Sequence, residues 1–200
     1  MKHITFLFIL FLTNTFVFSQ TEYVNKIKAH RKAVDIEFSD TAQSILPDSM
    51  ALKFKGLNYF EPNEDYRIKC KVKISVGEEF DMLTSKGKKK KYRRYGYLKF
   101  KLKGKRFKLP VYQSIRLMKM DEYKDYLFIP FTDLTSGHQS YGGGRYIEAS
   151  IPTGKRFILD FNYAFNPYCH YTTGYNCPIP PSETFLNVEI LAGEKSYDMH

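Results

Sequence analysis

Two aspartates and two histidines in the second half of the sequence have side chains that could carry acid–base or metal chemistry: Asp133, His138, Asp160 and His170. A carboxylate with two imidazoles can hold a divalent metal, and a carboxylate can orient a histidine that acts as a general base. A metal-assisted hydrolase on this basis would use Asp133, His138 and His170. Alternatively, Asp133 serves a turn, His138 lies on the surface and Asp160 ends a strand. No spacing here matches a catalytic motif such as HExxH, so the catalytic residues and any cofactor stay open.

The segment 141–145, YGGGR, places a cationic side chain beside a glycine-rich turn. Backbone N–H groups exposed by glycine, together with Arg145, could bind a phosphate or a carboxylate. Phosphate-binding loops normally lead from a strand into a helix, whereas this turn precedes a predicted strand. The alternative is a hairpin or bulge in which Arg145 pairs with an internal acid such as Asp160 or Glu183.

Tyrosine, phenylalanine and asparagine crowd the segment 160–176, which is polar and aromatic rather than basic. Exposed rings beside amides suit a sugar or another flat polar ligand, although the same rings could pack the loop onto a sheet. Loops of this kind on a β scaffold commonly carry function. We therefore expect a binding module for a small polar or anionic ligand, formed by the loops 132–146 and 160–183. The expected ligand-binding residues are Tyr141, Arg145, Asn162, Asn166 and Tyr171, with Asp160 in a structural role.

Three cysteines are present, and two of them, Cys169 and Cys177, lie eight positions apart in the same polar segment. In an oxidising compartment this pair could form a disulfide. Two free structural thiols, or a metal site that adds His170, are the alternatives, although the spacing is not that of a CxxC zinc pair. Cys70 falls on the inward face of a predicted strand, so we expect a buried free thiol there.

The segments 127–147, LFIPFTDLTSGHQSYGGGRYI, and 159–181, LDFNYAFNPYCHYTTGYNCPIPP, followed by AGEK at 192–195, resemble a bacterial domain family of unknown function, DUF1684. The segment 56–63, GLNYFEPN, resembles its upstream motif. The resemblance covers most of the chain, from the first predicted helix to Tyr197. It implies one domain with a shared site, and it implies no activity.

Periodicity predicts which elements must position these residues. Helical spacing of apolar residues predicts a helix over 23–38, and Pro47-Asp48-Ser49 could open a second, short helix that Gly56 ends. Apolar–basic alternation predicts a strand over 66–74 and a hairpin from 95–103 to 106–112, with a turn at Gly104-Lys105. Further strands are expected at 125–131, 146–151, 155–162 and 185–192. The fold class is therefore mainly β, a β-sandwich or a partly open barrel with one or two N-terminal helices.

The chain is basic, with a formal net charge of +10, and part of that excess lies in the segment 86–94, KGKKKKYRR. A cationic surface favours anionic partners, but a charge run between strands is more often a solvated loop. We expect no nucleic-acid partner, because no nucleic-acid-binding motif is recognisable. The role of this run stays open.

The N-terminus has the features of a secretory signal peptide. Lys2 and His3 precede an apolar run over 4–12, and small residues at Val17 and Ser19 suit cleavage before Gln20. The run is too short for a membrane helix, and no later segment is long enough for one. We therefore expect residues 1–19 to be removed and residues 20–200 to form a single exported domain, periplasmic or extracellular. Its oligomeric state stays open, and a structural or interaction domain of the cell envelope is the third functional interpretation.

Overall fold

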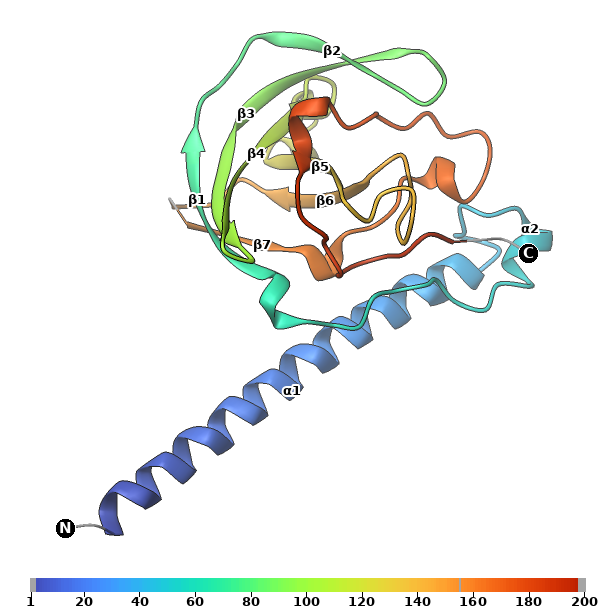
Figure 1. Cartoon of the computed structure of the whole chain (residues 1–200). Helices are drawn as coiled ribbons and strands as arrows, with labels where there is room; N and C mark the ends of the chain where they lie inside the picture. Colours follow the sequence, from blue (N-terminus) through green and yellow to red (C-terminus); the bar gives the residue numbers. More distant parts are fainter. Residues whose placement is uncertain (1–2, 155, 198–200) are drawn as a thin grey trace.

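The computed structural model describes the backbone of residues 3–154 and 156–197 and the side chains of 20–154 and 156–197. A curled, mostly antiparallel sheet forms a half-barrel, and one long helix runs past its open side (Figure 1). The predicted mainly β class is confirmed, in the form of a partly open barrel. The predicted signal peptide falls on residues whose side chains lie outside this description, so export and cleavage stay predictions.

Eight strands are present in the described residues: β1 Arg67–Ile74, β2 Glu79–Leu83, β3 Lys89–Leu102, β4 Lys105–Ser114, β5 Tyr126–Asp133, β6 Arg145–Ser150, β7 Arg156–Asp160 and β8 Phe185–Leu186. Their order is β6-β5-β4-β3-β1-β7, while β2 pairs with β3 and β8 pairs in parallel with β5. Within the described part of the chain, β6 and β7 form no ladder with each other, and this leaves the barrel partly open.

The predicted hairpin is confirmed as β3 and β4. Lys103 and Gly104 turn the chain with φ values of 46° and 78°, and two positive φ angles are the geometry that matches the twist of paired strands. The basic segment 86–94, in contrast, is a loop only at residues 86–88. Residues 89–93 belong to β3 and pair with β2, a strand that the sequence analysis did not predict.

The strand predicted over 185–192 is largely absent, because only Phe185–Leu186 forms a ladder. The Ile190 N–H and C=O bond instead to the side chains of Asp133 and Arg145. Side chains thus satisfy the backbone hydrogen-bonding groups of a segment that the alternation of apolar and polar residues had assigned to a sheet.

Helix α1, His3–Ser39, contains the predicted helix 23–38 in its C-terminal part. Tyr23, Ile27, Arg31 and Phe38 are buried on the side that faces the barrel, at the spacing of one helical face. The second predicted helix is confirmed as a single turn, α2 Asp48–Ala51. Among the described residues, no helix is both long and apolar enough to cross a membrane.

Two separate apolar clusters pack on the two faces of the sheet. The larger contains Leu109, Ile129 and Phe161, all fully buried. The smaller is mainly aromatic and consists of Met82, Tyr92, Tyr112, Phe128 and Tyr146. Along β4 and β5 the two clusters alternate, with Ile129 in the larger and Phe128 in the smaller. Because neighbouring residues of a strand project from opposite faces, the larger cluster fills the barrel and the aromatic cluster lies on its outer face.

Candidate functional site

Arg145 and Asp133 form a buried ion pair inside the barrel. Arg145 Nη2 lies 3.2 Å from Asp133 Oδ1, and neither side chain is exposed. The guanidinium also donates to the carbonyls of Ile190, Ala192 and Glu194, at 2.9, 2.5 and 3.1 Å. Asp133 Oδ2 accepts the Ile190 N–H at 2.7 Å. The pair holds the C-terminal segment. The guanidinium of Arg145, which was expected to bind a ligand, is enclosed by protein groups instead.

Half-buried Asp160 and buried Asn162 form a second polar group, which fastens α1 to the barrel. The Tyr23 hydroxyl donates to Asp160 Oδ2 at 2.8 Å, and Asn162 Nδ2 donates to the Tyr23 oxygen at 2.9 Å. Asn162 also exchanges hydrogen bonds with the backbone of Asn63, at 2.8 and 2.9 Å. Asp160 and Asn162 thus both contact Tyr23 of α1, and the Asn162 amide, which was expected to bind a ligand, is hydrogen-bonded within the protein.

Asn166 and Tyr171 surround a buried carboxyl group that the sequence analysis did not identify. Glu194 Oε2 accepts the Asn166 N–H at 2.7 Å and the Tyr171 hydroxyl. Burial, as the largest cause, raises the pKa of Glu194 to about 7. Asn166 Oδ1 is buried without a hydrogen-bond partner among the described residues. These groups, with Asn162, line an inner cavity of about 300 Å³.

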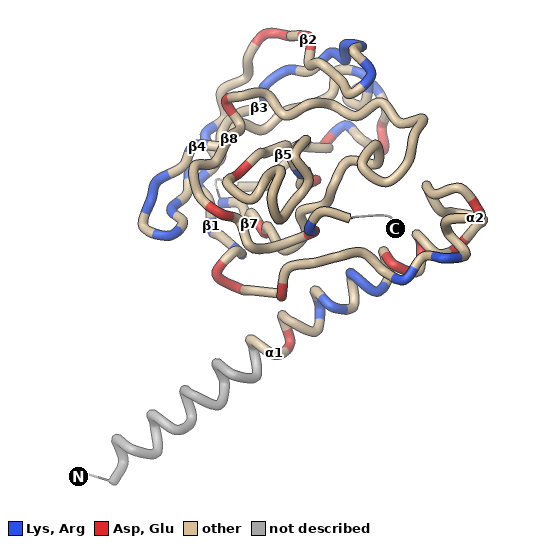
Figure 2. Tube along the Cα trace, turned by 45° about the vertical axis from the view of Figure 1, so that its right-hand side comes forward, with Lys and Arg blue, Asp and Glu red and all other residues tan. Residues whose placement is uncertain are grey.

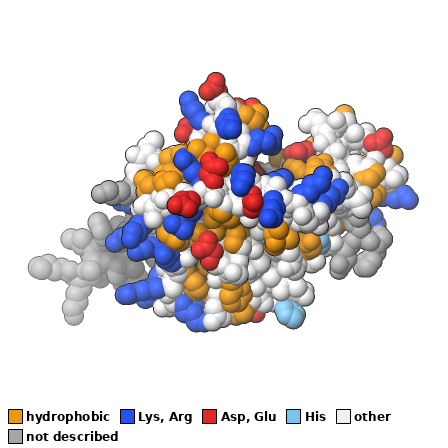
Figure 3. Space-filling view, turned by 90° about the horizontal axis from the view of Figure 1, so that it is seen from above, with side chains coloured by type: hydrophobic (Ala, Val, Ile, Leu, Met, Phe, Trp, Pro, Cys, Tyr) orange, Lys and Arg blue, Asp and Glu red, His pale blue; other side chains and the backbone are white. Residues whose placement is uncertain are grey.

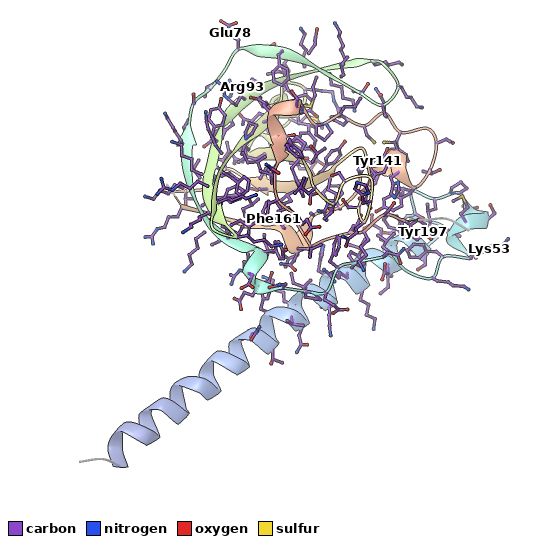
Figure 4. The ribbon with its side chains drawn as sticks, viewed as in Figure 1. Lys53, Glu78, Arg93, Tyr141, Phe161 and Tyr197 are labelled. Carbon is purple, nitrogen blue, oxygen red and sulfur yellow. The ribbon has the colours of Figure 1, made fainter. Side chains whose placement is uncertain are left out.

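Tyr141 and the two histidines do not converge with Asp133. The Tyr141 ring packs on His170, with centroids 4.2 Å apart, and His170 Nε2 accepts the Tyr197 N–H at 2.9 Å. Tyr141 and Tyr197 lie on the side of the barrel toward α2 (Figure 4). His138 is exposed. In residues 3–154 and 156–197 no three His, Cys, Asp or Glu side chains are grouped to hold a metal, so the predicted set of Asp133, His138 and His170 is not assembled there.

Cys169 and Cys177 are close but not bridged. Both are free thiols, and the Cys169 N–H donates to Cys177 Sγ at 3.3 Å. Burial raises the pKa of Cys177 to about 11. Cys70 is a buried thiol, as expected. Of the three interpretations of this cysteine pair, the structure matches two free thiols rather than a disulfide or a metal site.

A further cavity, which we call the basic cavity, has a volume of about 700 Å³. Its aromatic lining belongs partly to the smaller apolar cluster and partly to the predicted loop 160–183. Five cationic residues and one acid, Glu148, also line it. The aromatic residues are Tyr92, Tyr126, Phe128, Tyr146, Phe165 and Tyr168, and the cationic ones are Lys89, Lys90, Lys91, Arg116 and Lys119.

The cationic residues of the basic cavity differ in how they are paired. Lys91 Nζ lies 3.0 Å from Asp81 Oδ1, and Lys90 Nζ donates to the Asn176 carbonyl at 2.6 Å. Arg116 and Lys119 form no ion pair among the described residues. Two cations are thus available to a negatively charged group above an aromatic surface. Seen from the β2 side, this end of the molecule shows Lys and Arg among apolar side chains (Figure 3).

Glu148 is the acid in this cavity, and its charge opposes a bound anion. The Tyr126 hydroxyl donates to Glu148 Oε1 at 2.7 Å. Glu148, Phe165 and Tyr168 also line the inner cavity, so the two cavities share these residues. The excess positive charge of the basic cavity is therefore concentrated at Arg116 and Lys119 and is not spread evenly over its lining.

Sequence reasoning missed this cavity because its lining comes from distant segments. Lys90 and Tyr92 were assigned to a solvated run, yet in β3 they lie two residues apart and project from one face. The signal that could have found them is this alternation inside the basic run. Of the two loops expected to form a pocket, 160–183 contributes Phe165 and Tyr168 to this cavity, and 132–146 contributes Tyr146.

Comparisons with known proteins agree with this fold. A family profile described as "Protein of unknown function (DUF1684)" matches residues 52–195. Among solved structures, the chain is similar to an uncharacterized protein of Haloarcula marismortui determined by NMR in solution. The two share 34% sequence identity over 88% of this chain and 96% of that chain, with a TM-score of 0.65. No curated protein matches.

Proposed function

Because this chain belongs to the DUF1684 family, described only as proteins of unknown function, we propose its function from the basic cavity: it binds a small amphiphilic anion. The acidic headgroup contacts Arg116 and Lys119, and the apolar body packs on the aromatic lining. With the export predicted from residues 1–19, the site would act outside the cytoplasm.

The observation that carries the proposal is the presence of unpaired cations and an aromatic lining in one cavity of about 700 Å³. That volume lies within the range of about 300–1,000 Å³ usual for small-molecule sites. The half-buried ring of Phe165 and the exposed ring of Tyr168 supply apolar contact area, which stabilises a bound ligand by about 25 cal/mol for each Å² removed from water. A cation at the rim adds a charge-assisted hydrogen bond and selects an acidic headgroup.

The test compares octanoate with 1-octanol, two probes that share an apolar chain and differ in charge. Isothermal titration would measure each against the wild-type protein and against an Arg116→Ala/Lys119→Ala variant. We expect the variant to bind octanoate about tenfold more weakly, which corresponds to about 1.4 kcal/mol, and 1-octanol unchanged.

The matched control removes two exposed lysines elsewhere, Lys28→Ala/Lys32→Ala on α1. It lowers the net charge equally and should leave octanoate binding unchanged. Equal binding of octanoate and 1-octanol to the wild-type protein, or no binding of either, would overturn the proposal.

A further inference from the structure

Four cationic side chains form a row across the outer face of the barrel. Arg156 on β7 lies opposite Lys71 on β1, Lys71 opposite Lys99 on β3, and Lys99 opposite Lys108 on β4. All four are exposed. Directly opposite residues project from the same face, and neighbouring strands are about 4.8 Å apart, so the row spans about 14 Å. We call these four residues the cationic row.

The strands of the cationic row offer one acidic side chain, Asp160 at the end of β7, which lies four residues from Arg156 and accepts a hydrogen bond from the Tyr23 hydroxyl. β1 contains no Asp or Glu, and neither do residues 95–112, which form this part of β3 and β4. Within the described residues, none of the four cations forms an ion pair. Because like charges directly opposite one another destabilise a sheet, the cationic row is a place where a bound anion would relieve repulsion.

Further cations flank the cationic row on the same strands. Lys69 and Lys73 alternate with Lys71 on the exposed side of β1, and Lys101 lies opposite Arg106. Lys and Arg are grouped along β1 and β4 (Figure 2). The charge is therefore spread over several strands, which suits an extended partner better than a single small ion.

We propose that the cationic row binds a linear polyanion, specifically an acidic polysaccharide. Such a polymer carries charges at intervals comparable to the strand spacing and can follow the outside of a curled sheet. A bilayer is flat and is usually bound with inserted apolar side chains, of which the cationic row has none. None of its residues lines the basic cavity, so this inference is independent of the proposed function.

Single-stranded nucleic acid fits the surface less well, because its bases stack on exposed aromatic rings. The aromatic residue beside the cationic row is Tyr97. Lys108 Nζ lies 3.7 Å from the centroid of its ring, and the Arg94 guanidinium lies 4.8 Å from it. The Tyr97 ring is therefore covered by cations, and a nucleic-acid base would find no free ring to stack on.

The test uses Lys99→Glu and a matched control, Lys32→Glu on the exposed side of α1, which changes the net charge equally. Binding of a galacturonate decasaccharide, a single-stranded oligonucleotide of the same charge and phosphatidylglycerol vesicles would be measured at several salt concentrations. We expect the decasaccharide to bind the wild-type protein most tightly, and Lys99→Glu to weaken it at least about tenfold with a smaller salt dependence. The control should retain wild-type affinity.

A melting experiment separates loss of binding from loss of folding. Lys99→Glu places a carboxylate between Lys71 and Lys108, so its melting temperature should rise above that of the wild-type protein. Equal loss of affinity in both variants would overturn the inference, since net charge alone would explain it. Tighter binding of the oligonucleotide or the vesicles would overturn the choice of partner.

Discussion

Arg145 and Arg116 belong to two regions that use the same side chain in opposite ways. Arg145 is fully buried, paired with Asp133 and bonded to three carbonyls. Arg116 borders a cavity, is exposed and has no ion-pair partner among the described residues. A buried charge needs partners to offset its desolvation, whereas an exposed unpaired charge remains available to a ligand. Polar residues that resemble a binding motif can therefore serve the fold, and an unpaired charge at a cavity is the better guide to where a ligand could bind.

The largest effect is expected from breaking the buried pair. Arg145→Met leaves the Asp133 carboxylate buried without its cation and frees the carbonyls of Ile190 and Ala192. Loss of one partner of a buried ion pair typically costs about 3–5 kcal/mol, so we expect the free energy of unfolding to fall by that amount. Urea denaturation would measure it. A loss below about 1 kcal/mol would show that the pair does not hold the C-terminal segment.

The next effect concerns Glu194 and is a pH dependence. Its pKa is raised from 4.5 to about 7 in the folded protein by burial. Between these values the folded state holds the proton more tightly than the unfolded state does. Stability is therefore fully present below about pH 4.5 and falls as the pH rises through 7, by about 3 kcal/mol in total. Unfolding measured from pH 4 to pH 8 should show this decrease, and Glu194→Gln should remove it.

The control for that experiment is Glu189→Gln, at an exposed position. It should keep the wild-type pH profile, because an exposed carboxyl gains little from folding. If Glu194→Gln kept the decrease as well, the dependence would belong to another group, such as Asp35, whose pKa is also raised by burial.

The regular part of the sheet could be predicted from the sequence, because one face of each strand is buried. Alternation identified β1, and Gly104 marked the turn between β3 and β4. β2 was missed because its alternation of charged and apolar residues covers only Glu79–Met82, and Leu83 ends it. The seam between β6 and β7 follows from curvature that no local pattern encodes.

The candidate site was predictable only in part, for a physical reason. Asn162, Asn166 and Arg145 have the residue types of a ligand site, but all three are nearly or fully buried. Whether a polar group turns inward depends on distant partners, such as Asp133 for Arg145 and Tyr23 for Asn162. Sequence spacing does not contain these contacts, since they join segments more than ten positions apart.

The smallest effect on stability is expected from Arg116→Met, which makes the same substitution as Arg145→Met in the other region. An exposed cation without a partner contributes little to folding, so the free energy of unfolding should change by less than about 0.5 kcal/mol. Octanoate binding should nevertheless weaken, because one of the two unpaired cations of the basic cavity is lost. Urea denaturation and titration of the same sample would check both. A stability loss comparable to that of Arg145→Met would mean that Arg116 also serves the fold. The distinction between an arginine paired inside the protein and an arginine available to a ligand would then fail.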